Sequence, residues 1–175
     1  MKRIFAFLLC IITVFTLIGC EDKEEQKEIV SLDIEAEADA IIAKYEISGG
    51  NRFTSKSQEP GKYLDEDLIR AYYGDAASMP DFGKVEAYAV YIDESRPLDP
   101  CEFGIFKFKD EKDIDDFMLY LKARIDLKIQ NAKSYPTMDT EALKTAKFTK
   151  KENYLWYCVV KGGNEEINKN LEGKF

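Results

Sequence analysis

The sequence predicts an α+β domain, a two-layer sandwich in which helices pack on an antiparallel sheet of about four strands. Two runs rich in Val, Ile, Tyr and Phe, Val85 to Ile92 and Cys101 to Lys109, flank the short connection 93–100 and are typical of a β-hairpin. A long apolar stripe at helical spacing follows them, and such a stripe needs a sheet face to cover. With the elements below, the order after the N-terminal segment is ααββαββα.

The first two helices are indicated by apolar residues three and four positions apart. One begins near Asp33 and ends at Gly49 and Gly50, where two glycines stop the pattern. The other lies in LDEDLIRAYYG, where Asp65 is placed to cap the N-terminus and Gly74 to end the helix. Both helices precede the hairpin.

The longest helix follows Asp110, which we predict as its N-cap. The helical region ends at the Tyr135-Pro136 step, because a residue that precedes proline is pushed toward extended conformations. Its apolar stripe consists of Ile114, Phe117, Met118, Leu121, Ile125 and Ile129. Its basic residues Lys122, Arg124 and Lys128 lie off that stripe.

The remaining segments complete the predicted domain. Residues 51–61 (NRFTSKSQEPG) are polar and contain Pro-Gly, which predicts a loop. Two strands, about 143–149 and 154–161, flank a short polar turn, and a short helix over 165–171 closes the chain. No repeat or second domain is visible, so we expect one globular domain over residues 32–175.

The chain opens with a segment typical of an export signal. Lys2 and Arg3 are followed by a dozen apolar residues, 4–15, and the apolar run to Gly19 is about sixteen residues long, shorter than the ~20 that span a bilayer. Leu17-Ile18-Gly19-Cys20 stands where an A-x-A-like cleavage site is normally found, and it resembles the lipobox of bacterial lipoproteins.

The lipobox resemblance implies that residues 1–19 are a signal peptide and that Cys20 receives a diacylglyceryl group. Two or more acyl chains anchor a protein stably, and residues 20–31, which contain EDKEEQKE, then form a charged tether. The location implied is the extracytoplasmic face of the cell membrane. An uncleaved membrane anchor and an ordinary signal peptide remain as alternatives.

The charge of the chain limits its partners. The 175 residues are 45% hydrophobic and 33% charged, as in a folded domain, with 25 basic against 33 acidic residues. Loss of Lys2 and Arg3 with the signal peptide leaves 23 basic residues and a net charge of −10. Such a surface repels phosphate, so we expect no nucleic-acid partner and attachment to the membrane only through the lipid on Cys20.

Several segments carry a family resemblance: the lipobox, EFGIFKFKDEKDIDDFMLYLKARID, the Tyr135-Pro136 step and NYLWYCVVKGGNEEINK. They are similar to the uncharacterised bacterial lipoproteins that share domain of unknown function four-three-five-eight, over roughly residues 31–170. Residues 51–61 and the pair of cysteines depart from the usual pattern. The resemblance implies a secreted, membrane-anchored domain without an assigned activity, and it carries over no catalytic residue.

No catalytic set is recognisable in the sequence. The chain contains no histidine, which excludes Ser-His-Asp and Cys-His systems and the usual His-based zinc sites. No glycine-rich phosphate loop is present, so we expect no cofactor. The acids of DEKDIDDFMLYL suggest calcium, but they run directly into a helix without the EF-hand glycine. We interpret them as complements to the helix dipole and expect no metal.

Glu102 is the acid with the most interesting position, because it enters a strand among apolar residues. We interpret it as an acid at a strand end that points to solvent. The alternative is burial, which would raise its pKa and suit a general acid in a carboxylate-dependent hydrolase.

The aromatic residues suggest a binding surface, because flat rings stack on sugars or pack on partners. Tyr88 and Tyr91 fall on opposite faces of one strand, as do Trp156 and Tyr157 on another, so at least one of each pair belongs to the core.

Cys101 and Cys158 lie on two predicted strands. A disulfide between them is chemically permitted outside the cytoplasm, and burial as free thiols is the alternative.

The function that the sequence favours is a lipid-anchored domain without enzymatic activity that binds an envelope protein or a wall glycan. The alternative is a cell-envelope hydrolase that uses carboxylates.

Overall fold

The computed structural model describes residues 31–75, 77–96 and 98–175. The sheet has five strands, all antiparallel to their neighbours, in the order β1-β2-β3-β5-β4. The strands are β1 (Asn51–Thr54), β2 (Val85–Asp93), β3 (Cys101–Phe108), β4 (Lys147–Lys151) and β5 (Tyr154–Val159). The predicted α+β class and antiparallel sheet are therefore confirmed, with one strand more than expected.

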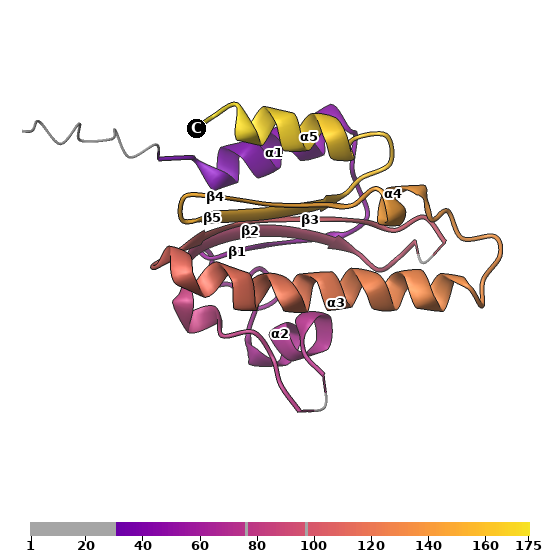
Figure 1. The fold of residues 1–175 in the computed structure, drawn as a ribbon, viewed down its shortest axis with the longest axis horizontal. Helices are drawn as coiled ribbons and strands as arrows, with labels where there is room; N and C mark the ends of the chain where they lie inside the picture. The colour runs from indigo at the N-terminus through magenta and orange to yellow at the C-terminus, as the bar shows by residue number, and fades with distance from the viewer. Residues whose placement is uncertain (1–30, 76, 97) are drawn as a thin grey trace, which may run out of the picture.

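Helices cover both faces of this sheet. On one face lie α1 (Ile34–Lys44) and α5 (Asn164–Glu172), and on the other lie α2 (Glu66–Tyr73) and α3 (Ile114–Ala132), as Figure 1 shows. The short α4 (Glu141–Lys144) sits at the end of the sheet where α3 returns to β4 (Figure 1). The prediction of two layers is wrong, because the domain has three.

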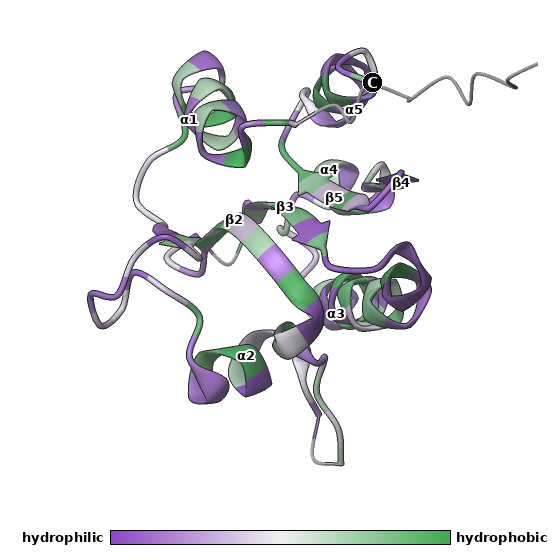
Figure 2. Cartoon of the chain, turned by 90° about the vertical axis from the view of Figure 1, so that its left-hand side faces the viewer, coloured by the Kyte–Doolittle hydropathy of each residue, from purple (hydrophilic) through white to green (hydrophobic). Residues whose placement is uncertain are grey.

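The third layer follows from the strands, which are apolar on both faces. In β5 every residue is buried, and in β3 only Lys107 is not buried. A strand of this kind needs cover on each side, so two separate cores form. One packs the sheet against α2 and α3, and the other packs it against α1 and α5. Figure 2 shows the sheet between these two pairs of helices.

The fifth strand, β1, lies in the segment predicted as a loop. Asn51 to Thr54 pair with β2 from Ile92 to Ala89, and Phe53 is the one fully buried residue among them. A four-residue edge strand with a single buried side chain has no alternating pattern that the sequence can reveal. The segment is extended because it pairs with β2.

Local capping explains where the helices begin. The side chains of Asp33 and Asp65 accept hydrogen bonds from the amides of Ala36 and Leu68, as N-caps do. Asp110 caps a 3₁₀ turn, Glu111–Asp113, instead of the long helix, which begins at Ile114. The strand predicted near 143 begins only at Lys147, because α4 comes first.

All four aromatic residues of the binding hypothesis are in the core. Tyr88 and Tyr157 pack on the side of α2 and α3, whereas Tyr91 and Trp156 pack on the side of α1 and α5. The prediction that each pair divides between the faces is correct. The proposal that they form a binding surface is wrong, because both faces of the sheet are covered.

The predicted signal peptide, Cys20 and most of the charged tether lie outside the described residues. None of the helices in the described ranges is long and apolar enough to cross a membrane.

Candidate functional site

Glu102 on β3 is fully buried and paired with two basic residues of α3. Its carboxylate accepts hydrogen bonds from Arg124 Nε (2.9 Å to Oε1), from Arg124 Nη2 (2.8 Å to Oε2) and from Lys128 Nζ (2.6 Å to Oε2). The side chain of Glu102 has no exposed surface, while Arg124 and Lys128 retain 9% and 20%. The prediction of a solvent-facing acid at a strand end is wrong.

Arg124 also connects this ion pair to the end of α2. Its Nη1 donates to the carbonyl oxygen of Tyr72 at 3.0 Å, one of the last carbonyls of α2 that lack a partner within the helix. The guanidinium lies 5.2 Å from the ring centre of Tyr72 and 5.8 Å from that of Tyr73. The negative end of the helix dipole and the faces of the aromatic rings both attract this cation.

A second carboxylate reaches the same cations from the solvent side. Glu94 follows β2, and its Oε1 accepts from Arg124 Nη2 at 2.6 Å and from Lys128 Nζ at 3.4 Å. Its side chain is 53% exposed. Two cations and two carboxylates thus form a neutral cluster, which we call the Glu102 cluster: Glu94, Glu102, Arg124 and Lys128.

The environment of Glu102 keeps its carboxylate ionised. Burial alone raises the pKa of such a group, but the charges and hydrogen bonds of Arg124 and Lys128 outweigh burial and hold the pKa of Glu102 below its usual value of 4.5. A general acid needs the opposite shift. The expectation of a raised pKa at this position is therefore wrong, although the burial behind it is real.

A pair of tyrosines closes the buried side of the cluster. The hydroxyls of Tyr73 on α2 and Tyr157 on β5 lie 3.2 Å apart, and both side chains are buried. Burial raises the pKa of both phenols above the ordinary 10.0, so they are neutral and can share one hydrogen bond.

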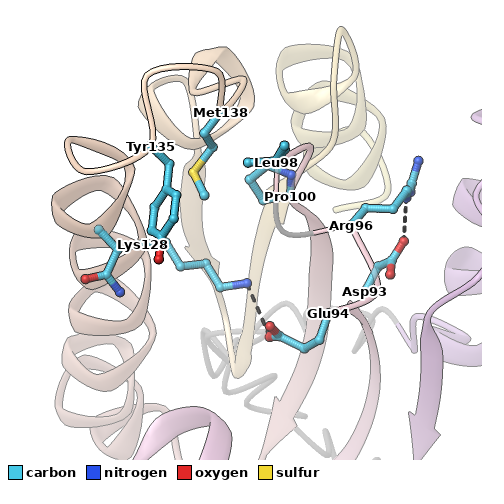
Figure 3. A pocket seen from close by; sticks show the side chains of 9 residues that line it. Asp93, Glu94, Arg96, Leu98, Pro100, Lys128, Tyr135 and Met138 are labelled. Atoms are coloured by element: carbon cyan, nitrogen blue, oxygen red, sulfur yellow. Dashed lines mark hydrogen bonds and ion pairs between the residues drawn. The ribbon is translucent and has the colours of Figure 1, made fainter.

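A hollow of about 330 Å³ opens beside the cluster, where the β2–β3 connection faces the end of α3. We call it the Tyr135 hollow. Figure 3 shows Tyr135 and Met138 on one side of it, Leu98 and Pro100 on the other, and Lys128 directed toward Glu94 at its base. The remaining lining residues are Asp93, Arg96 and Asn131. A volume of this size accommodates a small ligand or one large side chain.

A second hollow, of about 450 Å³, lies on the other side of Glu94 and Lys128. We call it the Tyr72 hollow. Tyr72, Tyr120, Leu127 and Arg124 line it, and Glu94, Lys128 and Asn131 line both hollows. The exposed half of the Glu102 cluster therefore separates the two hollows.

Exposed apolar side chains gather at these hollows. Four large apolar residues in the described ranges are exposed, and three of them line a hollow: Leu98 (46% exposed), Leu127 (57%) and Tyr135 (56%). The fourth, Leu119 on α3, lines neither. An apolar rim beside charged groups is typical of an interaction site.

A comparison with known families matches residues 60–160, more than half of the chain, to the domain of unknown function DUF4358. The chain belongs to the DUF4358 family. No curated protein and no solved structure matches it significantly. The DUF4358 match is narrower than the resemblance expected over residues 31–170, and it leaves α1, β1 and α5 outside.

All four residues of the Glu102 cluster and every residue that lines the Tyr135 hollow lie within the DUF4358 domain. The cluster was missed at the sequence level, although a signal existed. A glutamate inside an apolar strand needs a cation, and Arg124 and Lys128 stand four residues apart beside the stripe of α3.

Three of the five acids around the start of α3 form ion pairs with lysines. Asp110 caps a turn and pairs with Lys112, Asp113 pairs with Lys84, and Asp115 pairs with Lys150. In the part of this DUF4358 chain that the structure describes, no three acidic or cysteine side chains converge as metal ligands would.

Cys101 and Cys158 are buried free thiols. The register places Cys158 opposite Phe103, two residues along β3 from Cys101. Such diagonal neighbours are about 7 to 8 Å apart, beyond the usual span of a disulfide. The free-thiol alternative is the one that the structure adopts.

Proposed function

We propose that this protein is a lipid-anchored domain at the extracytoplasmic face of a bacterial membrane, that it binds an envelope partner through the Tyr135 hollow, and that it is not an enzyme. The observation that carries the proposal is the position of Leu98 and Tyr135, two exposed apolar side chains that face each other across a hollow with a charged base.

The anchor is supported by the N-terminal sequence. Leu17-Ile18-Gly19-Cys20 joins an apolar signal to a tract of charged residues, which is the arrangement of a lipoprotein precursor. Acyl chains on Cys20 would hold the domain at the bilayer, and the charged tract would keep it in water.

A binding role is favoured over hydrolysis by the state of the buried acids. Glu102 and Asp93 are the acidic residues buried in the described ranges. The pKa of Asp93, like that of Glu102, is lowered, because hydrogen bonds from Ser95 and Arg96 outweigh the effect of burial. Neither group holds a proton at neutral pH, and a glycosidase needs one acid that does.

The chemistry of the hollow favours a protein partner over a glycan. Leu98, Pro100 and Met138 offer carbon surface and no hydrogen-bonding side-chain group, so they suit an apolar side chain better than a sugar rich in hydroxyls. A wall glycan is the alternative outcome of the test below.

The anchor is tested by metabolic labelling with a fatty-acid analogue. Wild-type protein is expected to incorporate the label, and Cys20→Ala is expected to lose it and to accumulate as the uncleaved precursor. Labelled, normally processed Cys20→Ala protein would contradict the anchor.

The binding surface is tested by a photo-crosslinking amino acid at position 135, with position 119 as the matched control. Leu119 is exposed and apolar like Tyr135 but lines neither hollow. On living cells we expect a specific adduct from position 135 and none from 119. Equal capture at both positions, or turnover of a wall substrate that Glu102→Gln abolishes, would refute the proposal.

A further inference from the structure

The two carboxylates of the Glu102 cluster differ in exposure: one is buried and the other lies at the surface. Glu102 lies within β3, between β2 and β5, and has no exposed surface. Glu94 lies beyond the end of β2, is 53% exposed, and touches the same two cations. A rotation of its side chain into water breaks two ion pairs without moving a strand.

Both cations keep other partners when Glu94 turns toward solvent. Arg124 is held by Glu102 and by the Tyr72 carbonyl oxygen, and Lys128 is held by Glu102. When Glu94 turns away, Arg124 Nη2 and Lys128 Nζ each keep a donor directed at the place that its carboxylate leaves. The three remaining charges then sum to +1, next to two hollows.

We propose that the Glu94 carboxylate occupies the binding site of a ligand carboxylate, and that the ligand is a monocarboxylate with an apolar group. Its carboxylate replaces that of Glu94 on Arg124 and Lys128, and its apolar group enters the Tyr135 hollow. This inference rests on the proposed function and names the chemistry that the hollow recognises.

The lining of the hollow fits this ligand. Lys128 and Glu94 stand at the base of the Tyr135 hollow, and Leu98, Pro100, Tyr135 and Met138 form its walls (Figure 3). A carboxylate on Lys128 would therefore place a group attached to it among these side chains. Asn131 lines the same space and offers an amide to a polar group near the carboxylate.

Two sources supply this chemistry: the C-terminal residue of a peptide and a free organic acid. They differ in one group, since a peptide carries an amide beside its carboxylate. N-acetylphenylalanine reproduces the peptide terminus, 3-phenylpropionate reproduces the free acid, and N-acetylphenylalaninamide lacks the carboxylate and serves as the control.

A ligand that must displace an internal carboxylate binds only while the site is open. Its apparent affinity is therefore its intrinsic affinity multiplied by the fraction of time that the site is open. If Glu94 occupies the site nine-tenths of the time, its removal strengthens binding about tenfold. The matched control is Glu86, which is 48% exposed and pairs with Lys107 at 2.7 Å near the opposite end of β2.

The test is calorimetric titration of the full chain in detergent with the three probes. We expect wild type to bind N-acetylphenylalanine at least tenfold more tightly than its amide. Glu94→Gln should strengthen carboxylate binding about tenfold and leave amide binding unchanged, because the glutamine lacks the competing charge. Glu86→Gln should match wild type with every probe.

The arms of the test separate the two sources. The ligand is a peptide terminus if N-acetylphenylalanine binds more tightly than 3-phenylpropionate and Asn131→Ala removes the difference. The ligand is a free acid if 3-phenylpropionate binds equally or more tightly. Equal affinity for the carboxylates and the amide, absence of binding to Glu94→Gln, or unchanged affinity in Glu94→Gln would overturn the inference.

Failure here differs from failure of the proposed function. If crosslinking at position 135 captures a specific partner while the carboxylate probes do not bind, the binding domain stands and the ligand chemistry is wrong. If the probes bind as expected and position 135 captures no partner, the carboxylate site stands and the macromolecular partner is wrong.

Discussion

Glu102 of β3 and Arg124 of α3 form a two-point ion pair in the interior, with Nε 2.9 Å from Oε1 and Nη2 2.8 Å from Oε2. The pair joins the sheet to α3, and the bond from Arg124 to the Tyr72 carbonyl oxygen joins α2 to both. Three elements are thus connected at one guanidinium, which also lines the Tyr72 hollow.

The first prediction concerns the stability that this pair supports. Glu102→Gln leaves Arg124 and Lys128 with one carboxylate, the half-exposed Glu94, so one positive charge is uncompensated and the free energy of unfolding should fall by roughly 3–5 kcal/mol. Urea unfolding followed by circular dichroism measures the change. Glu86→Gln, which removes a half-exposed ion pair, should alter stability little. Equal effects of the two substitutions would contradict a structural role for the buried pair.

The second prediction is a pH dependence that Glu102 causes. Its pKa is below 4.5 in the folded protein and returns to about that value on unfolding, so near and below pH 4.5 the unfolded chain binds more protons. The stabilisation is therefore complete above pH 4.5 and is lost as the pH falls through the folded pKa.

Unfolding measured in urea from pH 7 to pH 3 should show this loss in wild type. The decline should be shallower in Glu102→Gln, which has no proton to bind at this position. The pKa of Asp93 is also lowered, so part of the loss of stability at low pH should remain in both proteins. Parallel curves for the two proteins would show that Glu102 does not cause the effect.

The third prediction concerns the two buried thiols. Burial raises the pKa of Cys101 to about 11 and that of Cys158 to about 12, so at pH 8 neither is a thiolate. In native protein, iodoacetamide should modify Cys101 slowly and Cys158 still more slowly, because Cys101 is 8% exposed and Cys158 fully buried.

Peptide mass mapping after timed alkylation measures this order, and both sites should react rapidly in urea. Rapid native labelling of Cys158, or recovery of the two cysteines in one cross-linked peptide without a reducing agent, would contradict the packing around β5.

The fourth prediction concerns Phe175, which stacks on Trp156 at 5.9 Å with an interplanar angle of 7° and meets Tyr154 edge to face. Phe175→Ala removes a half-buried ring and two aromatic contacts, so it should cost roughly 1–2 kcal/mol of stability. Trp156 is the single tryptophan, and its emission should shift to the red as water reaches it. Glu172→Ala, at an exposed position on α5, is the control and should change neither quantity.

The local elements were predictable because their signals are local. Asp65 caps α2 through an amide three residues away, and the run Val85 to Ile92 is a strand by its own composition. The edge strand β1 and the short α4 were not predictable, because four residues carry too little periodicity and pairing or packing decides their conformation.

The candidate site was predictable only in part. Glu102 was singled out because it stands in an apolar strand, but its ionisation state follows from Arg124 and Lys128, 22 and 26 residues away. The Tyr135 hollow joins the β2–β3 connection to the end of α3. No pattern within either segment reveals that these segments face each other.

The sequence by itself determined the α+β class, most helices and strands, and the family, since periodicity, capping and short motifs act over a few residues. Only the tertiary structure decided that helices cover both faces of the sheet, which places Tyr88, Tyr91, Trp156 and Tyr157 in the core. It also decided that Glu102 is paired and ionised. These properties depend on which distant side chains share one low-dielectric space, and that is settled by packing across the whole chain.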